Sequence, residues 1–281
     1  MDEQILYLDG LPIRYLARGS GAPLVLLHGS GENARDWRWI IPELARSYRV
    51  YAPELPVRRL RADLDVAFTS AFSTDFISAF LDSLSIKKVI LVGNSLGGLA
   101  ALRFALARQD RVTALVLANS AGLGQVLHPA IRLLAVPGYG DLATAWSQTP
   151  LGAWHRLWVR AILLFFRPGR IPASWFWEQY WLARQPGFLA ATLAELRSVI
   201  GLEGQREVLL AELRSLTIPT LIVWGNEDTI FPLAQAEAAV THLHHSSLKV
   251  IPACGHLPHI EHYERFAQTL LEFLGSQVRR I

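Results

Sequence analysis

The segment LVGNSLGGLAAL at residues 91–102 places Ser95 among three glycines, where an apolar run gives way to a helix-like pattern. A serine in the pattern G-x-S-x-G, between a strand and a helix, occupies a tight turn that exposes its hydroxyl. Its neighbours must lack bulk so that strand and helix pass close together, which accounts for Gly93 and Gly97. Gly98 lets the new helix sit against the sheet. The segment therefore predicts that Ser95 is a nucleophile.

A serine hydroxyl becomes a strong nucleophile when a base takes its proton and an acid orients that base. In this arrangement the acid and then the histidine are expected to follow the serine along the chain. Glu227 and Asp228, in the loop NEDTIFP after an apolar run over 218–225, are the candidates for the acid. His256, in the loop after the last strand-like run over 247–253, is the expected base.

The negative charge that develops on a carbonyl oxygen during attack needs backbone N–H donors. The N–H of Leu96, directly after the nucleophile, is the first expected donor. The loop HGSG after an early strand supplies the second, with Ser30 preferred and Gly31 in reserve. Gly29 and Gly31 are expected to border the substrate here, and His28 to brace the loop. These residues form a predicted oxyanion hole.

The other histidines are not expected to act in catalysis. His259 and His262 fall in or near the last helix, where we expect surface or packing roles. The loop cluster of His242, His244 and His245 has no accompanying cysteine or carboxylate at metal-ligand spacing, so solvated turn histidines are expected there. The sequence therefore predicts no metal site and no cofactor.

Strand-like and helix-like segments alternate along most of the chain and position these candidates. A hairpin is expected over 5–18, buried strands over 24–29, 48–53, 87–93 and 113–119, and further strands over 218–225 and 247–253. Helices are expected over 37–46, 74–84, 95–107, 204–214, 233–243 and 260–274. Strand, helix, strand, helix implies a parallel sheet with right-handed crossovers. The predicted fold class is α/β, with a mostly parallel eight-stranded sheet flanked by helices.

The alternation stops between about residues 123 and 200, where the chain is helical in character and interrupted by prolines. This segment holds six of the nine tryptophans. We expect a helical cap over 123–200, inserted into a core formed by 1–122 and 201–281. Seven arginines against three acids make the segment basic, which favours a solvated basic face. A surface for anionic lipid or an acidic substrate is the alternative.

Composition excludes several classes of protein. A hydrophobic content of 51% with 18% charged residues is typical of a globular chain rather than a disordered one. A net charge of +3 gives no support for a nucleic-acid partner. No signal peptide and no apolar run of spanning length is apparent, and a single cysteine excludes an internal disulfide. We expect a cytoplasmic protein without stable membrane insertion.

The stretches HGSG, GNSLGG, GNEDTIFP and CGHLPHIE, in this order, resemble the α/β-hydrolase family, in the branch with a helical cap. The resemblance covers nearly the whole chain apart from the cap. The family pattern G-x-x-D-x-x-x-P implies Asp228 rather than Glu227 as the acid. The other family position for an acid offers only Asn119 and Ser120, which carry no charge. One departure is the run PELPVRRLRADLD, where relatives carry Asp-x-Pro-Gly and further glycines.

The resemblance extends to esterases and to carbon–carbon bond hydrolases of aromatic-ring degradation. A serine nucleophile excludes haloalkane dehalogenases and epoxide hydrolases, which attack with a carboxylate. We expect hydrolysis of carboxylic esters with apolar, small to medium acyl or aryl groups, through an acyl-enzyme. Trp154, Trp158 and Trp177 of the cap are expected to bind this small-molecule substrate.

Three alternatives stay open. A carbon–carbon hydrolase of meta-cleavage-product type would use the same groups on a vinylogous diketone, with a polar or cationic side chain for the substrate carboxylate. A cofactor-free perhydrolase or acyltransferase would differ only in the second nucleophile. A ligand receptor on the same scaffold would turn substrate over very slowly.

Overall fold

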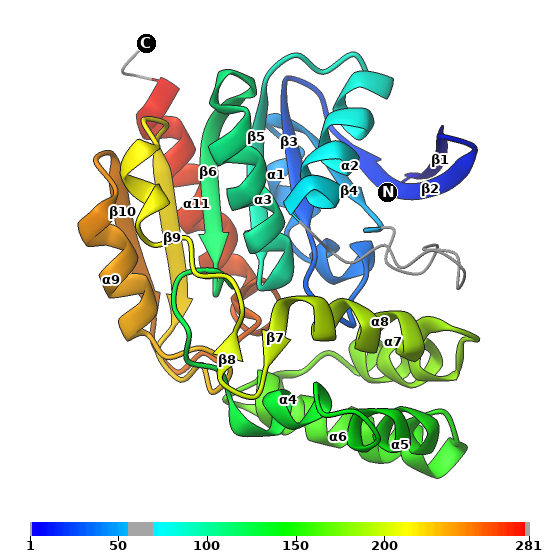
Figure 1. The fold of residues 1–281 in the computed structure, drawn as a ribbon. Coiled ribbons are helices and arrows are strands. Elements are labelled where there is room, and N and C mark those ends of the chain that lie inside the picture. The colour runs from blue at the N-terminus through cyan, green and yellow to red at the C-terminus, as the bar shows by residue number, and fades with distance from the viewer. Residues whose placement is uncertain (1, 56–69, 279–281) are drawn as a thin grey trace.

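The computed structural model describes residues 2–55 and 70–278, so the run of Arg58, Arg59 and Arg61 lies outside the described residues. Its centre is an eight-stranded sheet with the strand order β1-β2-β4-β3-β5-β6-β9-β10 (Figure 1). The strands are β1 (Asp2–Leu8), β2 (Leu11–Arg18), β3 (Ala22–Leu27), β4 (Tyr48–Pro53), β5 (Val89–Asn94), β6 (Val112–Ala118), β9 (Thr220–Gly225) and β10 (Ser246–Ile251).

Strand β1 pairs antiparallel with β2, and β2 pairs antiparallel with β4. All the other pairs in this sheet are parallel. This arrangement confirms the predicted mostly parallel, eight-stranded sheet. Because the carboxyl ends of parallel strands meet at one edge, the loops after β3, β5, β6, β9 and β10 lie together, where open α/β sheets bind ligands.

Helices cover both faces of the sheet. Helices α2 (Ser70–Ser83), α3 (Leu96–Ala107) and α9 (Ala234–His242) contribute to one hydrophobic cluster, and α1 (Ile41–Leu44) and α11 (Tyr263–Val278) contribute to the other. Alternate residues of β3 point to opposite faces of the sheet and pack in different clusters. Val25 and Leu27 belong to the first, while Leu24 and Leu26 belong to the second. Near-continuous apolar strands are therefore buried on both faces, as the sequence predicts.

Five helices lie between β6 and β9 in the chain, within the segment where the sequence predicts a cap. They are α4 (Pro129–Leu134), α5 (Tyr139–Ser147), α6 (Pro150–Leu164), α7 (Ala173–Arg184) and α8 (Phe188–Val199), followed by a small hairpin of β7 (Ile200–Gly201) and β8 (Gly204–Gln205). Figure 1 shows these helices beneath the carboxyl ends of the strands. None of the helices described is long and apolar enough to cross a membrane.

The helix predicted over 204–214 is wrong. The chain there forms β8 and a short 3-10 helix over Glu212–Ser215. Gly204 has a φ of +122°, outside the helical region. The buried Gln205 turns its side chain inward, and its Oε1 accepts a hydrogen bond of 2.7 Å from the N–H of Gly122. A contact with a distant part of the chain therefore overrides the local helical pattern.

Two other predicted helices are shorter or divided. The segment 37–46 contains only α1, preceded by a 3-10 helix over Ala34–Trp37. Pro42 lies in the first turn of α1, where its missing N–H prevents a longer helix upstream. The final helix, expected over 260–274, is divided into α10 (Pro258–Glu261) and α11.

Candidate active site

Ser95 lies in a strained turn between β5 and α3. Its φ of +53° and ψ of −118° fall outside the regions that L residues favour. A Cβ on Gly97 would come within 2.2 Å of the carbonyl oxygen of Leu27, and one on Gly93 within 2.3 Å of the carbonyl oxygen of Gly97. Only glycine fits at both positions, so the flanking glycines let the strand and the helix approach closely enough to present the serine.

Asp228 and His256 meet at the carboxyl edge of the sheet. Asp228 follows β9 and His256 follows β10, and Nδ1 of His256 lies 2.9 Å from Oδ2 of Asp228. Both side chains are buried. The N–H groups of Ile230 and Phe231 donate to Oδ1 of Asp228 at 2.8 and 3.2 Å. Glu227 is instead exposed, so the structure brings Asp228 and not Glu227 to the histidine.

Asn119 is a contributor that the sequence reasoning missed. Its Nδ2 donates to Oδ2 of Asp228 at 2.7 Å, and its Oδ1 accepts from the N–H of Gly225 at 3.3 Å. Asn119 directly follows β6 and has a φ of +42°. The sequence signal that could have identified Asn119 is its position directly after a central strand. The sequence analysis assessed this position only for an acid, and an amide carries no charge. Asn119 orients the carboxylate that faces His256.

The loop over residues 28–31 lies directly against the serine. The N–H of Gly29 donates to Oε2 of Glu32 at 3.0 Å, and Nε2 of His28 accepts from the N–H of Leu55 at 3.0 Å. These bonds brace the loop, as expected for His28. A Cβ on Gly29 would lie 3.0 Å from the Cβ of Ser95. The backbone of this loop therefore approaches the nucleophile closely.

Ser30 connects this loop to the cap. Its hydroxyl donates a hydrogen bond of 2.6 Å to Oε2 of Glu195, on α8. Ser30 and Leu96 both line the cavity beside Ser95. The N–H of Leu96 belongs to the first turn of α3, where a helix leaves its N–H groups without partners inside the helix. The two predicted donor residues thus line the same cavity as the nucleophile.

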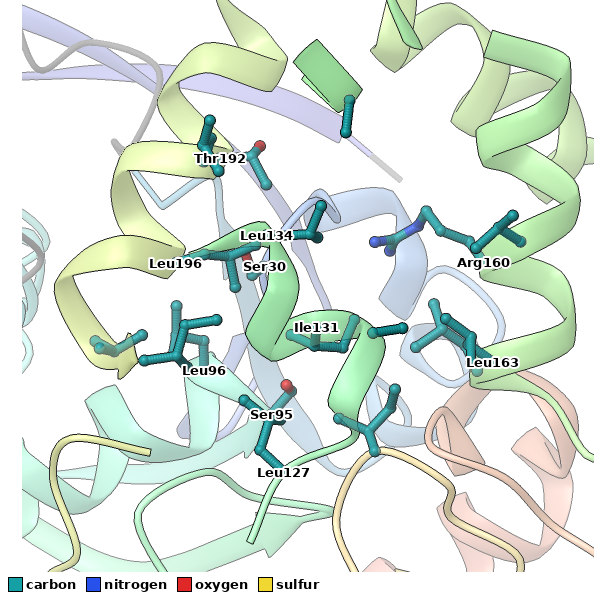
Figure 2. Close-up of a pocket in the computed structure, with 18 of the residues that line it drawn as sticks. Ser30, Ser95, Leu96, Leu127, Ile131, Leu134, Arg160, Leu163, Thr192 and Leu196 are labelled. Atoms are coloured by element: carbon teal, nitrogen blue, oxygen red, sulfur yellow. The ribbon is translucent and has the colours of Figure 1, made fainter. Parts of the chain in front are cut away.

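A cavity of about 310 Å³ lies between the sheet edge and the cap helices, and both Ser95 and His256 line it. Figure 2 shows the Ser95 hydroxyl directed into this space. Its wall is largely apolar and includes Leu96, Leu99, Leu127, Ile131, Leu134, Leu163, Leu164, Leu189, Leu193, Leu196, Ile230 and Phe231. No hydrogen bond joins Ser95 to His256 among the described residues; such contacts often tighten only when substrate binds.

The expectation that Trp154, Trp158 and Trp177 line the cavity is corrected by the structure. They are 38%, 51% and 54% exposed and are absent from the wall that the described residues form. Their rings pack on the outer side of the cap, where the centroids of Trp154 and Trp177 are 5.7 Å apart. Helix α6 is apolar on several sides, so spacing alone did not reveal which side faces the sheet. Trp146 of α5 lines the cavity instead.

Two arginines of the cap enter the cavity wall one helical turn apart, Arg156 and Arg160. Figure 2 shows the guanidinium of Arg160 reaching from α6 into the space above Ser95. Its Nη2 lies 4.0 Å from Oε1 of Glu32, and its Nε and Nη2 have no hydrogen-bond partner among the described residues. Arg156 donates one long bond of 3.5 Å to Gln179. Burial lowers the pKa of both guanidinium groups, and for Arg156 the neighbouring Arg160 lowers it further.

Burial also acts on two carboxyl groups of this region. It raises the pKa of Glu195 to about 8, with a smaller contribution from the charge of Glu32. Burial, Glu32 and Glu178 together hold the pKa of Asp36 well above its usual range. Among the described residues, Glu32 supplies the carboxylate that lies within 4.0 Å of the Arg160 guanidinium.

One end of α6 is fastened to the loop that carries His256. The N–H of His256 donates to the carbonyl oxygen of Leu164 at 2.7 Å. The buried Glu261 accepts from the N–H of Gly255 at 2.7 Å and from the N–H of Arg167 at 2.7 Å. The carboxylate of Glu261 thus joins the cap to the loop of the candidate base.

The remaining histidines occupy other environments. His259 is fully buried and stacks on Trp37 with ring centroids 4.1 Å apart, and burial lowers its pKa to about 3. Nε2 of His262 lies 2.9 Å from the carbonyl oxygen of Ala253, to which it donates in the tautomer that carries its proton there. His244 and His245 are exposed. No group of metal-binding side chains occurs within residues 2–55 and 70–278.

The model of the alpha/beta hydrolase family matches residues 24–269. A 2-hydroxy-6-oxo-6-(2'-aminophenyl)hexa-2,4-dienoic acid hydrolase of Metapseudomonas resinovorans is 31% identical, over 98% of this chain and 91% of that protein. A 2-hydroxymuconate semialdehyde hydrolase of Pseudomonas sp. (strain CF600) is 32% identical, over 92% and 88%. The solved structure of a meta-cleavage product hydrolase from Pseudomonas fluorescens IP01 is similar with a TM-score of 0.80, 25% identity and 97% coverage of both chains.

Proposed function

Because the chain belongs to the alpha/beta hydrolase family, we propose that it is a serine hydrolase that cleaves a carbon–carbon bond beside a ketone, in a substrate that also carries a carboxylate. Two relatives above 30% identity are named as hydrolases of such compounds, a dienoic acid and a muconate semialdehyde. This proposal replaces ester hydrolysis, expected from the sequence, as the first candidate.

The observation that carries the proposal is the unsatisfied guanidinium of Arg160 in the cavity. Its Nε and Nη2 are buried and have no hydrogen-bond partner among the described residues. A buried guanidinium with unfilled hydrogen bonds is costly unless an acceptor joins it. Arg156 and Arg160 both line the cavity, and the nearest carboxylate, that of Glu32, stays 4.0 Å from Arg160, so a substrate carboxylate suits the unfilled donors. A substrate carboxylate bound there leaves the rest of its chain to extend along the apolar wall toward Ser95.

In the proposed reaction, Ser95 Oγ bonds to the ketone carbon while its proton passes to Nε2 of His256. Asp228 holds the imidazolium through Nδ1. The ketone oxygen becomes an oxyanion, which the N–H groups of Leu96 and Ser30 stabilise. The proposal thus assigns each residue at the sheet edge one task.

The substrate reacts as its keto tautomer, in which the hydroxyl proton has moved to the carbon beside the ketone and made it a CH2 group. When the carbonyl forms again, the bond between this carbon and the carbonyl carbon breaks. Its electron pair enters the adjoining enone as a dienolate, which takes the proton from His256. Water then attacks the acyl group on Ser95, giving one proton to His256, which returns it to Oγ. The products are a carboxylic acid and a dienol acid, and one water molecule is consumed.

Ester hydrolysis is the second candidate, and the apolar cavity wall favours it. The attack on an ester carbon is the same, except that an alkoxide leaves and takes the proton. An apolar acyl or aryl ester needs no cation, so Arg160 separates the two candidates.

The test compares two substrates on purified wild type, Ser95→Ala and Arg160→Gln. One is the ketone 2-hydroxy-6-oxo-6-phenylhexa-2,4-dienoate, followed by loss of its absorbance, and the other is p-nitrophenyl butyrate. We expect turnover of the dienoate that Ser95→Ala abolishes. Arg160→Gln should lower kcat/KM for the dienoate roughly tenfold to a hundredfold, the effect of one charge-assisted hydrogen bond. The ester should be affected much less. Efficient turnover of the ester alone would establish the second candidate.

A further inference from the structure

The outer side of the cap carries large apolar side chains in the open. On α6 these are Leu151, Trp154, Trp158 and Ile162, at 73%, 38%, 51% and 65% exposure, and on α7 there is Trp177, at 54%. Spacings of three and four residues align the α6 set along one side of its helix. The contact between Trp154 and Trp177 joins this row to α7. We call these five residues the aromatic face.

The composition of the aromatic face is unusual for a surface in water. Apolar residues on soluble proteins are usually scattered singly, and contiguous exposed patches mark interaction sites. Tryptophan is enriched where proteins meet the interface of a lipid bilayer, because its ring is apolar and its N–H is polar. Helices that lie in that interface carry Trp and Leu on one side and arginines beside them. The pair α6 and α7 has this pattern.

Positive charge surrounds the aromatic face. Arg167 and Arg170, both exposed, follow α6 and precede α7, at one end of the helix pair. Arg184 lies at the other end, where its guanidinium donates to the carbonyl oxygen of Gln148. These arginines complement an anionic surface, to which each basic residue contributes about 1 kcal/mol of attraction.

The acids of the cap do not cancel this charge. Asp141 binds the guanidinium of Arg197 at 2.8 Å, and Glu178 binds that of Arg38 on the core side. Glu195 is buried against Ser30. Each of these carboxyl groups is therefore engaged away from the aromatic face, and the charge presented with the tryptophans is positive.

The cavity opens beside this face. Val159, on the neighbouring side of α6, and Trp146 of α5 both line the cavity and are 39% and 49% exposed. A molecule that leaves a bilayer under the aromatic face is thus one helix width from the cavity wall.

We propose that the aromatic face binds the surface of a bilayer that contains anionic phospholipid. The interaction is peripheral, with the tryptophans at the level of the headgroups and α6 and α7 lying parallel to the surface. On the proposed function, this contact also brings Ser95 close to substrates whose apolar part partitions into the bilayer while their carboxylate stays at its surface.

The binding test uses Ser95→Ala protein, so that its outcome is independent of turnover and of the proposed function. Protein is floated with vesicles of phosphatidylcholine, alone or mixed with phosphatidylglycerol. We expect binding to the anionic vesicles, a blue shift of tryptophan emission and quenching by lipids brominated near the headgroup. Adding salt should weaken the binding, because it screens the charges.

Two variants and two matched controls locate the surface. Trp158→Ser with Trp177→Ser, and Arg170→Glu with Arg184→Glu, should each weaken binding at least about tenfold. Leu202→Ser and Lys249→Glu, exposed changes outside the face, should not. Circular dichroism checks that every variant is folded. Absence of vesicle binding, equal binding by all variants, or a dimer in light scattering that the tryptophan changes dissociate would each overturn the proposal.

Discussion

Replacing Glu195 with glutamine is expected to change how the stability of the protein depends on pH. Glu195 is 4% exposed and accepts the hydrogen bond from the Ser30 hydroxyl at 2.6 Å. Burial raises its pKa from 4.5 to about 8. Glutamine has nearly the same shape and offers a carbonyl oxygen for the same bond, but it does not ionise. The substitution therefore removes the titration and keeps the contact.

Whether Glu195 makes the protein more or less stable as the pH rises depends on the number of protons bound in the folded and unfolded states. Between pH 4.5 and about pH 8 the folded protein keeps a proton on Glu195 that the unfolded chain releases. The contribution of Glu195 to the free energy of unfolding is therefore complete below pH 4.5 and is lost as the pH rises to about 8. At about 1.4 kcal/mol for each pKa unit, the loss is on the order of 5 kcal/mol. The glutamine variant lacks this loss.

Urea unfolding followed by tryptophan fluorescence at about pH 5 and about pH 9 measures the difference. We expect the stability of Glu195→Gln relative to wild type to increase between the two pH values by several kcal/mol. Asp141→Asn is the matched control, because the pKa of Asp141 is lowered to about 2 by its hydrogen bond from Arg197 and so lies outside this range. If Glu195→Gln and wild type lose stability in parallel across this range, Glu195 is already ionised in the folded protein and the reasoning fails.

Three further predictions concern single positions. Asp228→Asn should lower kcat on the order of 10⁴-fold without a matching loss of thermal stability, measured by steady-state kinetics and calorimetry, because an amide no longer fixes the tautomer of His256. Gly97→Ala should lower the free energy of unfolding by at least about 3 kcal/mol in urea, since its methyl group would meet the Leu27 carbonyl at 2.2 Å. Gly275→Ala, inside α11 with no atom within 4 Å of the added methyl group, should instead be neutral or stabilising by up to about 1 kcal/mol. Cys254 is fully buried and its pKa is raised, first by burial, so a disulfide reagent should label it only after denaturant is added; rapid labelling of the native protein would contradict its burial.

The sequence was sufficient for the features that depend on local backbone geometry. The glycines around Ser95 predict a tight turn, because a side chain at Gly93 or Gly97 would collide with neighbouring backbone atoms. Apolar strands separated by helices imply parallel neighbours, and parallel neighbours bring the loops of Asp228 and His256 to one edge. These inferences need no knowledge of packing between distant side chains.

Features that depend on packing between segments were missed. Asn119 contributes through a hydrogen bond to Asp228, across two loops more than a hundred residues apart. The cap tryptophans were assigned to the wrong side, because α6 carries large apolar residues on its exposed side and arginines on its cavity side, the reverse of the usual pattern. The interaction of Gln205 with Gly122 is likewise invisible in the local pattern that favoured a helix.

The bonds at Glu261 and Leu164 limit the motions available to the cap. They fasten the end of α6 to the segment that carries His256, so a rotation that lifts this end would pull the imidazole from Asp228. A cap motion that keeps His256 beside Asp228 is therefore expected to leave this junction in place and to move the parts of the cap away from it.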